Sequence, residues 1–198
     1  TPYILLFGFV MLIVAGGLLL TIPVASNSGD FTPLDVAFFT AVSAITVTGH
    51  TIENTGSYWS GFGQGVIFVL MLVGGLGFMA VATFLLILIG QRSSLQERMV
   101  MRDTMGAERM EGLRRVTLNI LAVVFCIYGL GAAAIFWRIN GLGDMSLGES
   151  VWQSSFLAVS AFNNAGFSIL PDSLSDAGLG VEWAFLGFMT VLIILGGI

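Results

Sequence analysis

The sequence has few charged residues and a single cysteine. Only 10% of its 198 residues are charged, whereas ordinary soluble domains carry about a quarter. Cys126 lies in an apolar run, so we interpret it as a packing residue rather than part of a disulfide or metal framework. No cluster of histidine, cysteine or paired carboxylates interrupts the apolar segments. That absence argues against an enzyme.

Hydrophobic residues make up 56% of the chain, and its mean hydropathy is +0.95. A soluble protein of this length cannot bury that much apolar surface, so we expect an all-α integral membrane protein. A helix of about 20 residues spans the hydrocarbon layer of about 30 Å. Four segments are predicted to cross the membrane: Tyr3 to Ile22, Phe62 to Ile89, Thr117 to Trp137 and Val181 to Ile198. Because the last run stops at Ile198, the sequence is expected to be a piece of a longer chain.

Two apolar runs, Asp35 to Ile45 and Val151 to Phe162, are too short to cross and are predicted to be re-entrant helices. Thr32-Pro33-Leu34-Asp35 predicts an N-cap at Thr32 with proline at the first helical position. Ser146-Leu147-Gly148-Glu149 predicts a capping box. The cap acids are 114 residues apart (149 − 35), less than the offset of the segments that follow, so the second short helix should be about one turn longer.

The chain reads as two copies of one unit. FTAVSAITVTGH (39–50) aligns with FLAVSAFNNAGF (156–167) at an offset of 117, and VLMLVGGL (69–76) aligns with VLIILGGI (191–198) at an offset of 122. We therefore predict a first repeat over residues 1–90, a connector over 91–116 and a truncated second repeat over 117–198. Each repeat crosses the membrane twice, so the two are parallel and related by an axis along the membrane normal.

The basic residues indicate the orientation. All seven are arginine, and six of them lie in the connector. Because basic loops stay in the cytoplasm, the connector and the N-terminus are predicted to be cytoplasmic and the two polar stretches to enter from outside. Non-helical backbone at membrane depth needs partners for its carbonyls, and rings of carbonyls that bind a dehydrated cation would provide them. Gly49 and Gly166 would permit the backbone angles that such a loop requires.

The stretches TVTG (46–49), SAFNNAGF (160–167) and the GGLGF of the second span resemble the first two repeats of the Ktr/Trk/HKT superfamily of potassium ion transporters, closest to the KtrB type. The resemblance implies a potassium-channel-like fold with four helix, pore loop, helix repeats. It also implies potassium uptake through a selectivity filter in the bacterial plasma membrane, with potassium as the transported ion and no organic cofactor. Carried over by position, the filter carbonyls would come from Thr46, Val47, Thr48, Gly49, Asn163, Asn164, Ala165 and Gly166.

The same resemblance implies partners: a cytosolic nucleotide-binding regulatory ring, a second copy of the full-length chain, and the lipid bilayer, with no nucleic acid. Gly49 indicates potassium, because a serine at the first filter position accompanies sodium preference in the plant branch. A sodium-permeable or ion-coupled transporter of the same fold is an alternative. A non-conducting membrane scaffold is another, and it predicts that the filter glycines tolerate bulky substitution.

Several residues keep a second interpretation. Asn163 and Asn164 are as well explained by side chains that brace the loop as by filter carbonyls. His50 is interpreted as a solvated residue at the outer mouth rather than a pH sensor. The glycines of the second span fit close packing better than a gating hinge; they are Gly74, Gly75 and Gly77. Five acids could concentrate cations at the entrance or form an ordinary wet surface: Asp30, Asp35, Glu53, Asp172 and Asp176.

Overall fold

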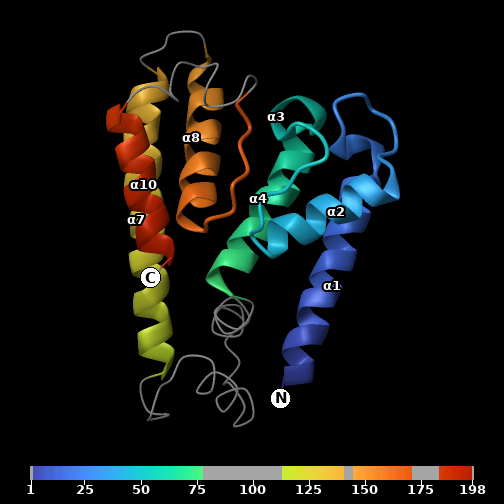
Figure 1. The fold of residues 1–198 in the computed structure, drawn as a ribbon, viewed down its shortest axis with the longest axis horizontal. Helices are drawn as coiled ribbons and strands as arrows, with labels where there is room; N and C mark the ends of the chain where they lie inside the picture. The colour runs from blue at the N-terminus through green and yellow to red at the C-terminus, as the bar shows by residue number, and fades with distance from the viewer. Residues whose placement is uncertain (1, 78–112, 141–144, 171–182, 198) are drawn as a thin grey trace.

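The computed structural model of the chain describes residues 2–77, 113–140, 145–170 and 183–197, and every regular element within them is a helix (Figure 1). We call residues 2–77 the first unit and the described residues from 113 to 197 the second unit. The remainder of the predicted second span to Ile89, residues 91–112 of the predicted connector, Asp172 and Asp176 lie outside the described residues.

Helices occupy the described parts of all four predicted spans except Ile22 and Gly77. The second predicted span is corrected, because its helix ends at Leu76 and Gly77 has a non-helical φ of 77°. The helices of the spans are α1 (Pro2–Thr21), α4 (Gly61–Leu76), α7 (Leu113–Asn140) and α10 (Trp183–Gly197). Their outward side chains are apolar and exposed, as at Phe7, Leu130 and Ile194. Within the described residues, Leu118–Asn140 alone is long and apolar enough to cross a membrane, with 23 residues and a mean hydropathy of 2.3. The apolar stretches of α1, α4 and α10 are shorter.

Both predicted short helices are present. The first, α2 (Leu34–Ile45), has 12 residues, and the second, α8 (Leu147–Phe162), has 16. The difference of four residues (16 − 12) is close to one helical turn, so the predicted difference in length is confirmed. In Figure 1, α2 runs across α1 and α4, and α8 stands beside α7 and α10.

The start of α8 is confirmed and the start of α2 is corrected. Ser146 caps α8, since its hydroxyl accepts from the Glu149 N–H at 3.3 Å and its own N–H donates to the Glu149 carboxylate at 2.9 Å. The hydroxyl and then the N–H of Ser146 hold the pKa of Glu149 below its usual value. In α2 the N-cap is Pro33, which has no side-chain acceptor. The predicted cap, Thr32, is buried, and its hydroxyl accepts from Tyr58 at 3.4 Å.

Each unit packs its short helix against its own two long helices. α2 contacts α1 and α4, and α8 contacts α7 and α10. A short helical turn, η1 (Pro23–Ala25), and α3 (Thr55–Tyr58) close the first unit beyond the C-terminal end of α1, where Ser60 N–H donates to the Ala25 carbonyl at 2.9 Å. The core of the first unit is completed by residues of the second, namely Phe156, Ala165, Phe167 and Ile169.

The junction between the units also contains a partly buried polar contact. The indole N–H of Trp152 donates to the Gln64 side-chain oxygen at 2.9 Å. The Gln64 amide donates in turn to the Trp59 carbonyl at 3.0 Å. The ring of Phe68 lies 5.4 Å from that of Trp152 and 6.0 Å from that of Phe156, measured between centroids. Since side chains of both units interdigitate here, the segment that follows α8 in the second unit is positioned by contacts with the first unit.

Candidate functional site

The short helices end in backbone turns of the same design, which start the first loop (residues 46–50) and the second loop (residues 163–168). At each helix end, three successive N–H groups donate to carbonyls four, three and five residues earlier. The N···O distances are 2.9, 3.3 and 3.0 Å for residues 46–48, and 3.0, 3.1 and 2.8 Å for residues 163–165. The sequence match at offset 117 is therefore also a match of hydrogen bonds.

The unusual backbone angles fall at matched positions too. Val47 and Asn164 have φ of 50° and 57°, and Gly49 and Gly166 have φ of 74° and 72°. Residues with side chains rarely adopt these angles, and a β-branched residue such as Val47 does so only where its surroundings enforce it. Both pairs are separated by 117 residues (164 − 47 and 166 − 49). The two loops thus follow the same strained path in two different surroundings.

The two glycines bring the loops into contact. A Cβ atom added to Gly49 would collide with the Ala165 carbonyl oxygen and lie 3.1 Å from the Cα of Gly166. A Cβ added to Gly166 would lie 3.4 Å from the Cα of Gly49. Glycine at both positions therefore serves two purposes, since it permits the positive φ and lets the two backbones approach each other.

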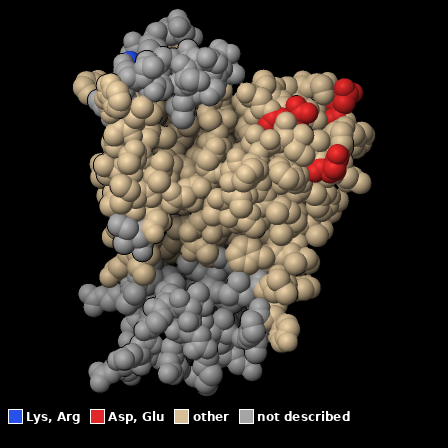
Figure 2. Space-filling view, in the orientation of Figure 1, with Lys and Arg blue, Asp and Glu red and all other residues tan. Residues whose placement is uncertain are grey.

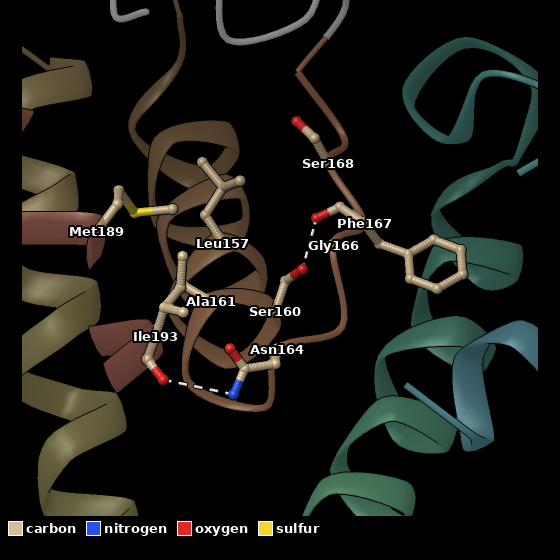
Figure 3. Close-up of a pocket in the computed structure, with 9 residues that line it drawn as sticks. All are labelled: Leu157, Ser160, Ala161, Asn164, Gly166, Phe167, Ser168, Met189 and Ile193. Atoms are coloured by element: carbon tan, nitrogen blue, oxygen red, sulfur yellow. Dashed lines mark hydrogen bonds between the residues drawn. The ribbon is translucent and has the colours of Figure 1, made fainter. Parts of the chain in front are cut away.

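Hydroxyl groups of the short helices hold the later part of each loop. The buried Ser160 donates its hydroxyl to the Phe167 carbonyl at 2.7 Å (Figure 3). At the matched place in the first unit, the Thr48 hydroxyl donates to the Ser43 hydroxyl at 3.2 Å. The SA dipeptide common to the two stretches thus supplies, in each unit, a serine that supports the loop.

The side chain of Asn163 braces the second loop. Its oxygen accepts from the Tyr128 hydroxyl at 2.7 Å, and its amide group donates to the Met71 carbonyl at 3.0 Å. The residue is 6% exposed. The side chain of Asn163 therefore braces the loop, as one of its two interpretations expects. These contacts do not involve its backbone carbonyl, which the other interpretation assigns to a filter.

Asn164 differs from its neighbour, because it is exposed. Its amide group donates to the Ile193 carbonyl in α10 at 3.4 Å, and it borders a cavity of about 230 Å³ between α8, the second loop and α10 (Figure 3). Leu157, Ala161, Met189 and Ile193 line the apolar side of this cavity. Gly166 and Ser168 line it from the loop.

The first loop is more open than the second. Thr46, which matches Asn163, is exposed, and its hydroxyl donates to the Val42 carbonyl at 2.7 Å within its own helix. His50 is exposed as well, in line with its interpretation as a solvated residue. Asp30 and Asp35 are exposed and Glu53 is partly buried. Figure 2 shows acidic side chains gathered at the end of the molecule that carries the α1–α2 connection.

The paired glycines of the long helices face the ends of the short helices. A Cβ added to Gly74 would collide with the Ile45 carbonyl, and one added to Gly196 would collide with the Phe162 carbonyl. A Cβ added to Gly75 would collide with the Asn163 side chain. The close-packing interpretation of Gly74 and Gly75 agrees with these contacts. A Cβ added to Gly77 would have no neighbour within 4 Å among the described residues, so this glycine shows no such close packing.

Sequence reasoning missed two residues that hold the second loop, Tyr128 and Ser160. A signal for Tyr128 was present, because a tyrosine inside an apolar span needs a partner for its hydroxyl. The sequence could not identify that partner, which lies 35 residues away along the chain. For Ser160 the signal was its alignment with Ser43 in the repeated SA dipeptide.

The chain is similar to known cation transport proteins over nearly its whole length. The family model for TrkH, described as a cation transport protein, matches residues 6–198. The chain is 37% identical over 191 residues to the potassium/sodium uptake protein NtpJ of Enterococcus hirae. The aligned residues cover 96% of this chain and 42% of that protein. It is 36% identical over 197 residues to the Ktr system potassium uptake protein B of Bacillus subtilis, covering 100% of this chain and 43% of that protein. The namesake protein of Vibrio alginolyticus is 35% identical over 173 residues, which cover 87% of this chain and 37% of that protein.

Proposed function

Because the chain belongs to the TrkH family of cation transport proteins, we propose that its two loops form half of a potassium-selective filter in the membrane subunit of a Ktr-type uptake system. The family is one of transporters rather than enzymes, and its members work in membranes. The chain spans about two fifths of the length of the relatives named above, at 42% and 43% for two of them. The filter, its four loops and its partners are therefore proposals for the full-length protein.

The observation that carries the proposal is the meeting of two loops of matching conformation at Gly49 and Gly166. A selectivity filter needs several copies of one loop around an axis, with carbonyls in place of the hydration shell of the ion. Residues 46–49 and 163–166 would supply those carbonyls. The C-terminal ends of α2 and α8 lead into the loops, so the partial negative charge of each helix favours a cation there.

The cavity beside the second loop is evidence that the full-length protein has further loops around the same axis. Ile193, which lines it, aligns with Met71 at the offset of 122 (193 − 71). In the first unit, that place is filled by the second loop, whose Asn163 donates to the Met71 carbonyl. By the same packing, the loop of a following unit would fill the cavity in the full-length protein.

A sodium-permeable transporter is the second candidate, because one relative with 37% identity is a potassium/sodium uptake protein. The name "Ktr system" also indicates further components. We accordingly propose a cytosolic nucleotide-binding ring and a dimer of the full-length chain. The proposed topology keeps the N-terminus and the Arg-rich connector in the cytoplasm and both loops outside.

Cation flux into liposomes tests the function. The full-length parent chain is reconstituted with its cytosolic partner, and potassium and sodium uptake are compared under an imposed voltage. Uptake of potassium well above that of sodium is the expected result. Equal uptake of both ions would favour the second candidate. No uptake by folded protein would favour a non-conducting scaffold and overturn the proposal.

A further inference from the structure

Tyr128 is the group whose placement the proposed filter leaves unexplained. It lies in the middle of α7, outside both loops, and is 6% exposed. Its ring packs edge to face against Phe125 and Phe162, with centroids 5.8 and 5.3 Å apart. Those ring contacts would be equally available to phenylalanine. The hydroxyl must therefore be explained by what it contacts, which is the side-chain oxygen of Asn163 at 2.7 Å.

The chemistry of this contact fixes the orientation of the Asn163 amide. The Met71 carbonyl can only accept, so the group facing it at 3.0 Å must be the NH₂ of Asn163. The side-chain oxygen then faces Tyr128, which donates. A reversed amide would place two oxygens together, so only one orientation satisfies both contacts.

The resulting chain of hydrogen bonds joins three elements. It runs from α7, through the first residue of the second loop, to α4 of the other unit. Gly75 makes room for it, since a Cβ at this position would overlap the Asn163 side chain. Asn163 lies directly before Asn164, the residue with φ of 57°, and three residues before Gly166. The link therefore fixes the loop where its strained conformation begins.

Among the residues that the structure describes, the first loop shows no such link. Thr46, which occupies the matched position, bonds within its own unit through the Val42 carbonyl and the Thr48 hydroxyl, the latter at 3.3 Å. The same backbone conformation is thus held locally in one loop and by two neighbouring spans in the other. This difference assigns different roles to the two matched residues.

We propose that Tyr128 is a positioning residue for ion selectivity: its hydroxyl orients the Asn163 side chain, and Asn163 sets the second loop against α4. The role rests on the proposed filter and goes beyond it, because Tyr128 touches no ion and lies on a span rather than a loop. Removal of the hydroxyl leaves the Asn163 oxygen buried without its donor. The amide can then rotate, and the loop loses its fixed distance from Met71.

The test compares variants of the full-length chain in liposomes with the cytosolic partner present. Tyr128→Phe keeps the ring contacts and removes only the hydroxyl. We expect the potassium-to-sodium uptake ratio to fall about threefold, the change that corresponds to an intramembrane hydrogen bond of about 0.6 kcal/mol. Asn163→Leu should lower the ratio at least as far. Adding Tyr128→Phe to Asn163→Leu should change it no further, because the tyrosine acts through the asparagine.

Tyr58→Phe is the matched control, since the Tyr58 hydroxyl donates to Thr32 at 3.4 Å beside the start of α2 rather than to a residue of either loop. It should leave the ratio unchanged. An unchanged ratio in Tyr128→Phe would overturn the positioning role, and so would a loss of thermal stability alone. Additive effects of Tyr128→Phe and Asn163→Leu would overturn it as well. Absence of selectivity in the parent chain would instead refute the proposed filter, so the two failures are distinguishable.

Discussion

At the scale of single residues, the glycines of the loops explain the backbone angles of the two loops and their close approach. Gly49 combines a φ of 74° with direct backbone contact to the second loop, whereas most of the described glycines have neither. The sequence indicated these positions through the repeat. It could not show that the two glycines touch each other, because that contact joins residues 117 apart.

Gly49→Ser should raise the sodium share of cation uptake by the full-length protein. The side chain would collide with the Ala165 carbonyl and would require a conformation that costs about 1–2 kcal/mol outside glycine. Competing uptake of potassium and sodium into liposomes measures the effect. Gly29→Ser is the matched control, because Gly29 has φ of 75° and a Cβ added to it would meet no atom of the described residues within 4 Å. A Gly49→Ser protein that is as selective as its Gly29→Ser counterpart would contradict the assignment of Gly49 to the filter.

At the scale of elements, the chain shows which helix boundaries local rules can predict. Ser146 and Glu149 form the expected capping box, since both partners are within four residues of each other. The same rule failed for α2, where the Thr32 hydroxyl accepts a hydrogen bond from the distant Tyr58. The N-cap residue of α2 is Pro33 instead. A local signal therefore predicts a helix start only where no distant group competes for the capping side chain.

The capping box makes the stability of α8 depend on pH. The pKa of Glu149 is lowered in the folded protein, so the unfolded state takes up a proton first as the pH falls. The stabilisation is fully present above the normal glutamate pKa and is lost as the pH drops through the lower folded value. Thermal unfolding in detergent should show this loss below about pH 4.3. Glu149→Gln should remove this part of the pH dependence, and an unaltered acid profile in that variant would refute the link.

The close contact between long and short helices gives a second prediction for this scale. Gly74→Ala should destabilise the protein by about 1–3 kcal/mol, because the new methyl group overlaps the Ile45 carbonyl and backbone has to shift. Gly65→Ala in the same helix is the control, since a Cβ added to Gly65 would meet no atom of the described residues within 4 Å. That control should be neutral or slightly stabilising. Equal stabilities of the two variants in detergent would contradict close packing at Gly74.

At the scale of the whole molecule, the two units form one structure because the second contributes to the core of the first. Phe167 and Ala165 are buried in the cluster built around α2 and α4. The Trp152 to Gln64 hydrogen bond lies at this junction. Both units therefore position the second loop, whereas the hydrogen bonds of Thr46 in the first loop lie within its own unit.

Trp152→Phe should lower the free energy of unfolding by about 1 kcal/mol. The substitution leaves the Gln64 oxygen without the indole donor and replaces the indole by a smaller ring. The free energy of unfolding in detergent measures the change. Trp183→Phe is the control, because Trp183 is 89% exposed at the start of α10. Similar losses in both variants would indicate a general effect of tryptophan replacement and contradict the importance of the junction.

The sequence by itself determined the helical class, the positions of the long and short helices, the repeat and the loop glycines. These features depend on local apolar periodicity, composition and self-similarity, all of which can be read along the chain. Only the tertiary structure decided that Asn163 braces its loop, that Tyr128 is its partner and that Gly49 meets Gly166. Those contacts join residues between 35 and 117 positions apart (163 − 128 and 166 − 49), and packing between helices, which no local pattern encodes, brings them together.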